Sequence, residues 1–285
     1  MEISMGNVII CQTKEGKQPF VFENARIEVY SYEELCYYIY YNIPMLEENT
    51  ITDKLLQWLI EELDLNELAD KIRRQKDLQN EASVYQTILG YRPYFTKREI
   101  DEFLIAFEEY RLLSTFQKQK KKADSLLLYK RYTKAFHIYE TIAMQMEQQD
   151  EMTREQKIFL GNIYHNMAVC QGKNFEWEQA RQDFRKAYSL NKNSESLKEY
   201  FFILMLGGFD DILEEEKKKF CLSEDFFLDI QDEIQDSEKE VEGMEIHKKF
   251  EYAKYNKEHG KYHDYSRRMD AMLEQWKMEL KEQWI

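Results

Sequence analysis

The sequence predicts a mainly α-helical protein, in which a small N-terminal α+β head with a short β-hairpin precedes a series of antiparallel helical hairpins. Glycine and proline number only 9 and 3 among 285 residues. A chain so poor in turn-forming residues favours long helices over sandwiches, barrels and doubly wound sheets. Aromatic residues make up 14% of the chain, so a few large side chains can seal the contacts between helices.

The first thirty residues differ from the rest because short β-branched or aromatic runs alternate with turn-forming residues. These runs cover residues 8–11, 20–22 and 27–30. In the last run, Ile27 and Val29 alternate with polar neighbours, and a period of two residues is typical of a half-buried strand. We expect two or three short strands that pack on helices, because an isolated hairpin is barely stable in water.

Capping patterns mark the start of two helices. In a capping box, a serine or threonine and a glutamate three residues later bond the free backbone N–H groups of the first turn. Ser31 with Glu34, and Thr96 with Glu99, fit this pattern. The first helix is expected to stop before Pro44, because proline lacks a backbone N–H group.

Further helices are expected over residues 53–62 and 65–72. The helix that begins near residue 96 can run unbroken into the region of the hairpins. The sequence therefore predicts an N-terminal head over residues 1–95 and a helical repeat domain over residues 96–285.

The clearest internal pattern lies between residues 164 and 187. Small side chains let two helix backbones approach, and aromatic side chains fill the space beside the contact. The small positions are Ala168, Ala180 and Ala187, and the large positions are Tyr164, Trp177 and Phe184. The pattern resembles a tetratricopeptide repeat, with departures from the family at Gln171 and Lys192.

Less regular units flank this repeat. The unit upstream has Ala123, Leu126, Tyr132, Ala135 and Tyr139 at corresponding positions, with Ile142 where a small residue is usual. Ala135 and Ala180 are 45 residues apart, against about 34 for the family, which predicts longer helices or a longer loop near residues 148–151. A third unit is expected to turn at residues 207–209, and a fourth covers residues 252–269. Between them, the acidic segment 214–242 is expected to be irregular, with a helix and an exposed loop. A helix over 267–284 is expected to cap the stack.

The segment from residue 30 to residue 40, rich in tyrosine, resembles the start of a group of clostridial proteins that also end in such repeats. This resemblance implies a bacterial cytoplasmic protein and supplies no activity.

The charge of the chain argues against nucleic-acid and membrane partners. The formal net charge is −14 and the pI about 5.0, whereas nucleic-acid binding depends on clustered lysine and arginine. The single dense basic run is Lys118, Lys120, Lys121 and Lys122, which we interpret as a solvated stretch. No signal peptide and no membrane-spanning run is expected.

We expect no metal, cofactor or catalytic activity. Cys11, Cys36, Cys170 and Cys221 are far apart, which fits neither a zinc site nor a disulfide framework and suits a reducing cytosol. No phosphate loop, nucleophile elbow or His-Glu-x-x-His motif is present. His259 and His263 are four residues apart, but Gly260 between them indicates a turn. An enzyme stays an alternative, because catalytic groups need not form sequence motifs.

The resemblance implies a concave groove that receives a protein or peptide, so an adaptor or scaffold is the favoured function. The residues that fall on this groove are Lys120, Asp124, Asn162, His165, Asn166, Val169 and Lys198. Some family members clamp a C-terminal carboxylate with lysine and asparagine, and Lys120, Asn166 and Lys198 match those positions. Asp124 departs from that clamp and would repel a carboxylate.

A second function class is a peptide-responsive transcription regulator with an N-terminal DNA-binding head. Residues 66–72 resemble part of a helix-turn-helix, but no glycine turn or second recognition helix is visible after Ile72. Residues 1–75 contain 7 basic and 14 acidic side chains, whereas a DNA-binding head is expected to be basic.

Overall fold

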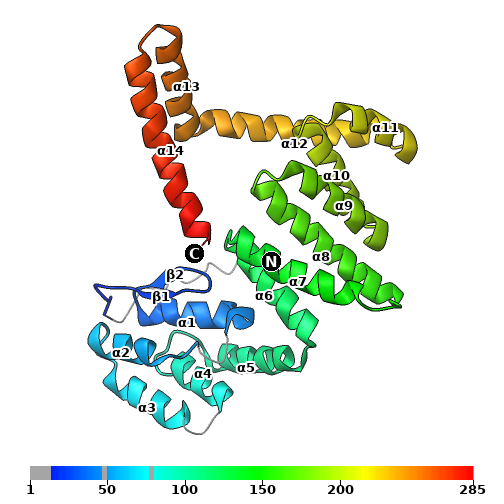
Figure 1. Ribbon diagram of the computed structural model, residues 1–285. Coiled ribbons are helices and arrows are strands. Elements are labelled where there is room, and N and C mark those ends of the chain that lie inside the picture. Colours follow the sequence, from blue (N-terminus) through cyan, green and yellow to red (C-terminus); the bar gives the residue numbers. More distant parts are fainter. Residues whose placement is uncertain (1–13, 47–49, 77–79, 285) are drawn as a thin grey trace, which may run out of the picture. The chain divides into compact units, whose positions relative to one another are not determined.

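The computed structural model describes residues 14–46, 50–76 and 80–284, and divides the chain into two compact units, Met1–Ser125 and Leu126–Ile285 (Figure 1). The predicted fold class is confirmed: helices dominate, and a short N-terminal β-hairpin precedes consecutive antiparallel helices. The domain boundary predicted between residues 95 and 96 stays a prediction. The strand expected over residues 8–11 lies outside the described residues.

The β-hairpin of the first unit consists of β1 (Phe20–Phe22) and β2 (Ile27–Val29), paired antiparallel with Phe20 opposite Val29. The hairpin packs on the helix that follows it, as the sequence predicts. The ring of Phe22 stacks on Tyr38 with 3.7 Å between centroids, and both side chains are buried.

Helix α1 (Tyr32–Tyr41) begins at the predicted cap, since the Glu34 N–H donates to the Ser31 hydroxyl. The Glu34 carboxylate accepts instead from the Tyr30 N–H. A 3₁₀ turn, η1 (Ile43–Met45), holds Pro44. The remaining helices of the head are α2 (Asp53–Glu61), α3 (Asn66–Lys76), α4 (Glu81–Leu89) and α5 (Lys97–Leu112).

Two features of this region differ from expectation. Helix α4 was not predicted; the Asn80 side chain caps it and Val84 and Ile88 are buried. Helix α5, which opens with the predicted Thr96–Glu99 capping box, does not run on into the hairpins. The Ser114 hydroxyl accepts from the Gln117 N–H and starts a new helix, α6 (Thr115–Leu128), which crosses the boundary between the units.

The second unit continues with helices joined by short connections (Figure 1). They are α7 (Tyr132–Glu147), α8 (Arg154–Lys173), α9 (Trp177–Asn191), α10 (Ser194–Leu206), α11 (Asp210–Phe220), α12 (Glu224–Gly243), α13 (Glu245–Glu258) and α14 (Tyr262–Trp284). Helix α8 packs against both α7 and α9, and α9 packs against α10. The long spacing between repeats comes mainly from α7 and α8, which have 16 and 20 residues.

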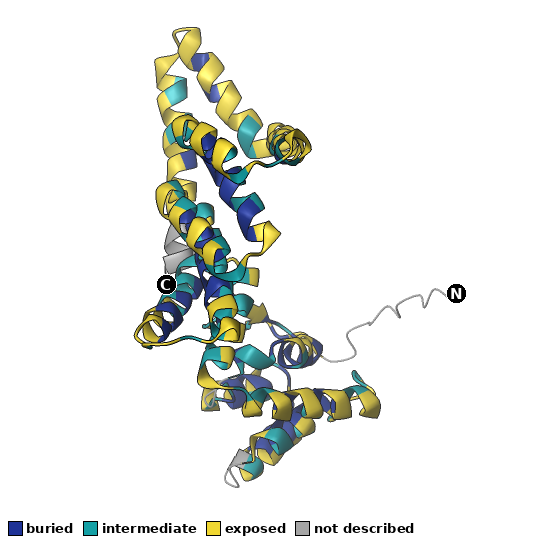
Figure 2. Cartoon of the chain, turned by 90° about the vertical axis from the view of Figure 1, so that its right-hand side faces the viewer, coloured by how far each residue is buried: buried dark blue, intermediate teal, exposed yellow. Residues whose placement is uncertain are grey.

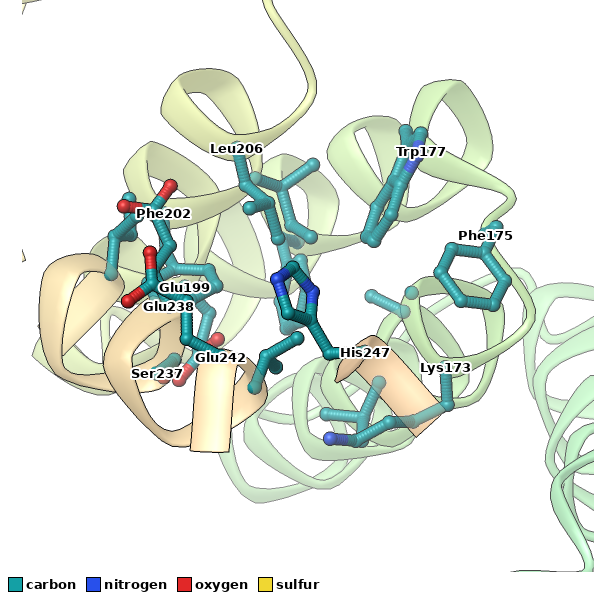
Figure 3. A pocket seen from close by; sticks show the side chains of 17 residues that line it. Lys173, Phe175, Trp177, Glu199, Phe202, Leu206, Ser237, Glu238, Glu242 and His247 are labelled. Atoms are coloured by element: carbon teal, nitrogen blue, oxygen red, sulfur yellow. The ribbon is translucent and has the colours of Figure 1, made fainter. Parts of the chain in front are cut away.

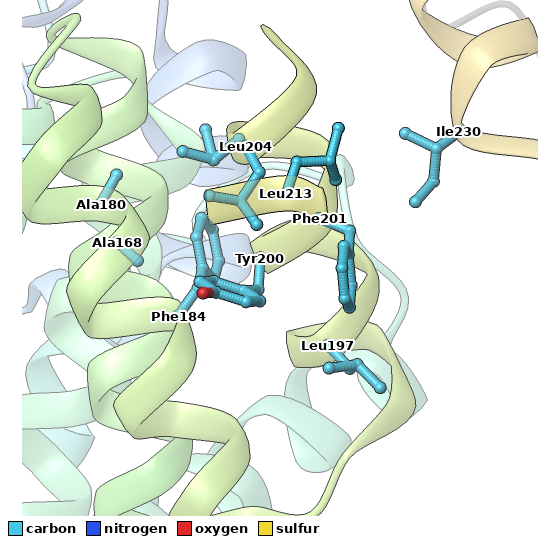
Figure 4. Close-up of a cluster of buried hydrophobic side chains, with 10 residues drawn as sticks. Ala168, Ala180, Phe184, Leu197, Tyr200, Phe201, Leu204, Leu213 and Ile230 are labelled. Atoms are coloured by element: carbon cyan, nitrogen blue, oxygen red, sulfur yellow. The ribbon is translucent and has the colours of Figure 1, made fainter. Parts of the chain in front are cut away.

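Small residues form the contact between α8 and α9, as the alanine pattern predicts. Ala168, Ala180 and Ala187 are fully buried. A Cβ atom on Gly161 would lie 2.7 Å from Asn191 Cβ, so the two helices approach closely there. Beside the contact, Phe184, Tyr200 and further side chains of α10 to α12 form one buried apolar cluster (Figures 2 and 4).

Between residues 214 and 242, where a helix and an exposed loop are expected, the structure has the end of α11 and most of α12, and only residues 221–223 lie between the two helices. Helix α11 ends at Cys221, which adopts a left-handed conformation, and Ser223 caps α12. Glu224 and Asp225 then lie in the first turn, where negative charge stabilises a helix. The last hairpin turns at Gly260, with φ +74°, and α14 starts five residues before the expected Arg267.

Candidate functional site

The second unit contains a cavity of about 840 Å³. Its walls come from α8, α9, α10, α12 and α13, so residues far apart in sequence line one space (Figure 3). The lining is largely apolar, with Val169, Phe202 and Ile203 among its members. Pockets of this size and composition are typical of binding sites.

Two aromatic residues follow the end of α8 and form what we call the aromatic wall, Phe175 and Trp177. Phe175 has a left-handed backbone, with φ +63°, and this conformation turns the chain from α8 into α9. The two rings meet edge to face with 5.5 Å between centroids. Phe175 is nevertheless 77% exposed, so most of its side chain is in contact with solvent.

On the other side of the cavity, carboxylates of α10 and α12 form what we call the acidic wall, Glu199, Glu238 and Glu242 (Figure 3). Burial raises the pKa of Glu199, and the nearby charges of Glu195 and Glu233 raise it further. The charges of Lys198 and Lys173 act in the opposite direction and lower the pKa of Glu199.

Helix α12 is held to α10 by a few side chains at its N-terminal half. Ile230 is fully buried in the apolar cluster, and the rings of Phe226 and Phe227 lie 5.8 and 5.3 Å from the ring of Phe201. Lys198 of α10 forms an ion pair with Glu233 of α12. These contacts place the C-terminal half of α12 along the cavity.

The residues predicted to line a partner-binding groove are divided between the two units. Lys120 and Asp124 belong to the first unit and form an ion pair one helical turn apart, with 2.7 Å between Lys120 Nζ and Asp124 Oδ2. The other five belong to the second unit. The carboxylate of Asp124 thus neutralises the ammonium group expected to bind a partner.

Three of the predicted polar residues on α8 bond to neighbouring helices. Asn162 Oδ1 accepts from the Asn191 side chain at 3.1 Å, and Asn166 donates to the hydroxyl of Tyr139 at 3.0 Å. His165 Nδ1 lies 3.1 Å from the buried hydroxyl of Ser196. These contacts hold α8 against α7, α9 and α10, and a role of the three residues in partner binding stays a prediction.

Val169 is the one member of the predicted set that lines the cavity. Lys198 lies close by and pairs with Glu233. Sequence reasoning missed Phe175, Leu206 and the carboxylates of α12 as lining residues. Phe175 could have been found from the sequence. It lies in the turn between two helices, where the repeat pattern requires no large apolar residue for packing.

A hydrogen-bonded cluster of polar side chains lies away from the cavity, between α7, α8 and α9. Tyr164 OH donates to Glu147 at 2.8 Å, and Lys186 Nζ donates to the same carboxylate and to Tyr164 OH. The hydrogen bond from Lys186 is the main cause that lowers the pKa of Glu147. This group ties α7 to α9 through α8.

The structure adds three observations on the classes of function weighed from sequence. Among the described residues, no three His, Cys, Asp or Glu side chains gather as a metal ion would require. Within the same residues, no helix has the length and apolar character needed to cross a bilayer. Helix α4, which follows α3, carries no lysine or arginine, and this composition does not favour a DNA-binding head.

No protein-family model, curated protein sequence or solved structure matches this chain.

Proposed function

We propose that this chain is a protein- or peptide-binding adaptor or scaffold, with a tetratricopeptide-like second unit whose cavity receives the partner. The observation that carries the proposal is apolar surface at the rim of the cavity. Phe175, Leu206 and Val241 line the cavity and are 77%, 45% and 46% exposed. Covering such side chains with a partner stabilises a complex, because apolar surface leaves water.

A polypeptide is the proposed ligand because the apolar side chains at the rim of the cavity are largely exposed to solvent. Small-molecule sites enclose most of the surface of their ligand, whereas the rim side chains here stand well into solvent. A polypeptide can insert anchoring side chains into the cavity and also cover the rim. The proposal includes no catalytic step.

We propose the cytoplasm as the setting. The cysteines of the described residues, Cys36, Cys170 and Cys221, are free, and free thiols suit a reducing compartment. The resemblance of residues 30–40 to clostridial proteins supports a bacterial origin. The regulator with a DNA-binding head is the alternative hypothesis, and salt-sensitive binding to duplex DNA would favour it.

Co-purification from the native host, followed by mass spectrometry, tests the proposal. The full chain should retain a reproducible protein partner, and Phe175→Ser should lose it. The matched control is Tyr262→Ser, which removes a 66% exposed aromatic ring from a residue that does not line the cavity. Retention of the partner by Phe175→Ser, or the absence of any partner, would contradict the proposal.

The sequence-predicted groove residues are tested in the same assay. Asn166→Ala and Lys198→Glu should each weaken retention if these side chains also contact the partner. Unfolding temperatures of both variants must be measured alongside, because Asn166 bonds to Tyr139 and Lys198 to Glu233 within the protein.

A further inference from the structure

The charge around the cavity is one-sided. Helix α12 contains nine acidic residues and one lysine among its 20 residues. That lysine, Lys239, pairs with Asp236 at 2.8 Å, so it does not offset the acidic wall. On α10, Lys198 is already bound to Glu233. Three carboxylates and one lysine, Lys173, line the cavity, so its lining has an excess of negative charge.

The carboxylates of this edge are regularly spaced. Glu238 and Glu242, which line the cavity, are four residues apart on α12; on α10, Glu195 precedes Glu199 by four residues but does not line the cavity. Residues at this spacing lie one above the other on a helix face, with about 5–6 Å between their Cβ atoms. A ligand with positive charges repeated once per helical turn matches this spacing.

The opposite edge is apolar and aromatic. Figure 3 shows Phe175 and Trp177 across the cavity from the acidic wall, with His247 between them. Among the described residues that line the cavity, Lys173 is the one lysine, and Figure 3 shows its side chain extending away from Phe175. A ligand must therefore be apolar on one face and basic along an adjacent face.

We propose that the cavity binds an amphipathic helical segment of a partner protein, with an apolar stripe against Phe175, Trp177 and Leu206 and with lysine or arginine residues one turn apart facing Glu199, Glu238 and Glu242. This inference rests on the proposed function and specifies the partner. A helix of about 10–12 Å diameter presents both faces at once. An anionic membrane or a nucleic acid would be repelled by the same carboxylates.

Binding of designed peptides to the full chain, measured by fluorescence anisotropy, tests this inference. Three labelled peptides of about five helical turns are compared. The first has a leucine and phenylalanine stripe flanked by lysine; the second replaces each lysine by glutamate; the third scrambles the first and destroys the stripe. The first peptide should bind at least about tenfold more tightly than the other two. The second keeps the apolar stripe but loses the positive charge, and the third keeps the positive charge but loses the stripe.

Two variants on α12 separate the acidic wall from the general charge of the protein. Glu238→Gln/Glu242→Gln should weaken the basic peptide about tenfold. The matched control, Asp232→Asn/Glu240→Gln, removes two exposed charges of the same helix that do not line the cavity, and should change binding less than about twofold. Raising the salt concentration from about 0.05 to 0.5 M should weaken the basic peptide strongly.

The outcomes distinguish the inference from the proposed function. If the acidic peptide binds as well as the basic one, and Phe175→Ala weakens both, the cavity binds peptides and the inferred charge is wrong. If the scrambled basic peptide binds equally, the attraction is nonspecific and the inference fails. If no peptide binds and Phe175→Ala changes nothing, the proposed function fails as well. A dimer of the chain that Glu238→Gln/Glu242→Gln abolishes would assign the site to a second copy and also overturn the inference.

Discussion

Helices α8 and α12 have the same length, 20 residues, but α8 is largely buried and α12 is largely exposed. Eight residues of α8 are buried, whereas in α12 a single residue, Ile230, is. Helix α8 packs against α7 and α9 through small and aromatic side chains. Helix α12 carries nine carboxylates among its 20 residues and touches α10 through a few apolar residues.

The comparison teaches that the periodic pattern and the binding surface lie in different helices. In a helix that is buried on several sides, most side chains contact neighbouring helices. Its polar residues therefore form hydrogen bonds within the protein, as Asn162 and Asn166 do. A helix attached along one narrow stripe leaves its other faces free for a partner. The carboxylates of α12 are therefore better candidates for recognition than the polar residues of α8.

The largest contrast is expected from removing one large apolar side chain from each region. Phe184, which packs beside the α8–α9 contact, is 1% exposed, and Leu228 of α12 is 49% exposed. Phe184→Ala should lower the free energy of unfolding by about 3–5 kcal/mol because it leaves a cavity. Leu228→Ala should cost less than about 1 kcal/mol. Chemical denaturation followed by circular dichroism measures both, and equal losses would break the comparison.

Adding a single methyl group is the second test. Gly161→Ala on α8 places a Cβ atom 2.9 Å from the Asn191 backbone N and 3.0 Å from the Ala187 carbonyl oxygen. We expect a loss of about 1–3 kcal/mol from overpacking. Gly243→Ala at the end of α12 has no atom within 4 Å of the new Cβ, and should be neutral or stabilising by up to about 1 kcal/mol. A neutral Gly161→Ala would show that α8 and α9 can separate without cost.

The third test uses pH. Hydrogen bonding from Lys186 lowers the pKa of Glu147, and burial, with Glu195 and Glu233, raises the pKa of Glu199. Glu147 therefore contributes stability above the ordinary carboxyl pKa, and loses it as the pH falls through that range. The contribution of Glu199 has the opposite sign: it is present below the ordinary carboxyl pKa and is lost as the pH rises.

Two substitutions read out these opposite signs. At about pH 7, Glu147→Gln should lower the unfolding temperature and Glu199→Gln should raise it, and both effects should shrink near about pH 4. Calorimetry at several pH values checks this. If both substitutions shift the unfolding temperature in the same direction, Glu147 and Glu199 do not contribute to stability with opposite signs, and this part of the comparison is wrong.

The smallest effect concerns the ion pair that joins α10 to α12. Lys198→Met removes the partner of Glu233 and should cost less than about 1 kcal/mol, because ion pairs at a surface are largely screened. The control, Lys239→Met, breaks an exposed pair within α12 and should leave the unfolding midpoint unchanged. A loss above about 2 kcal/mol for Lys198→Met would show that this pair, rather than Ile230, holds α12 in place.

Local sequence patterns predicted much of the fold. Alternation at Ile27 and Val29 gave the hairpin, Ser31 and Thr96 gave two helix starts, and the alanine spacing gave the burial of the α8–α9 contact. Helix α4 and the break at Ser114 were missed. In both, a single polar side chain starts the helix, and such a cap is common in loops as well.

The sequence by itself determined which helices have an apolar stripe and where small residues let them approach, because these properties depend on neighbours three or four residues away. Only the tertiary structure decided which polar residues remain available. Lys198 has a position suited to a ligand, yet the carboxylate of Glu233, from another helix, binds it; the pair of Lys120 with Asp124, four residues apart on one helix, is local by contrast. The cavity likewise required α12, whose lining residues begin at Ile234, 59 residues beyond Phe175, to pack beside α10. Contacts over such distances depend on how whole helices pack, which no local pattern encodes.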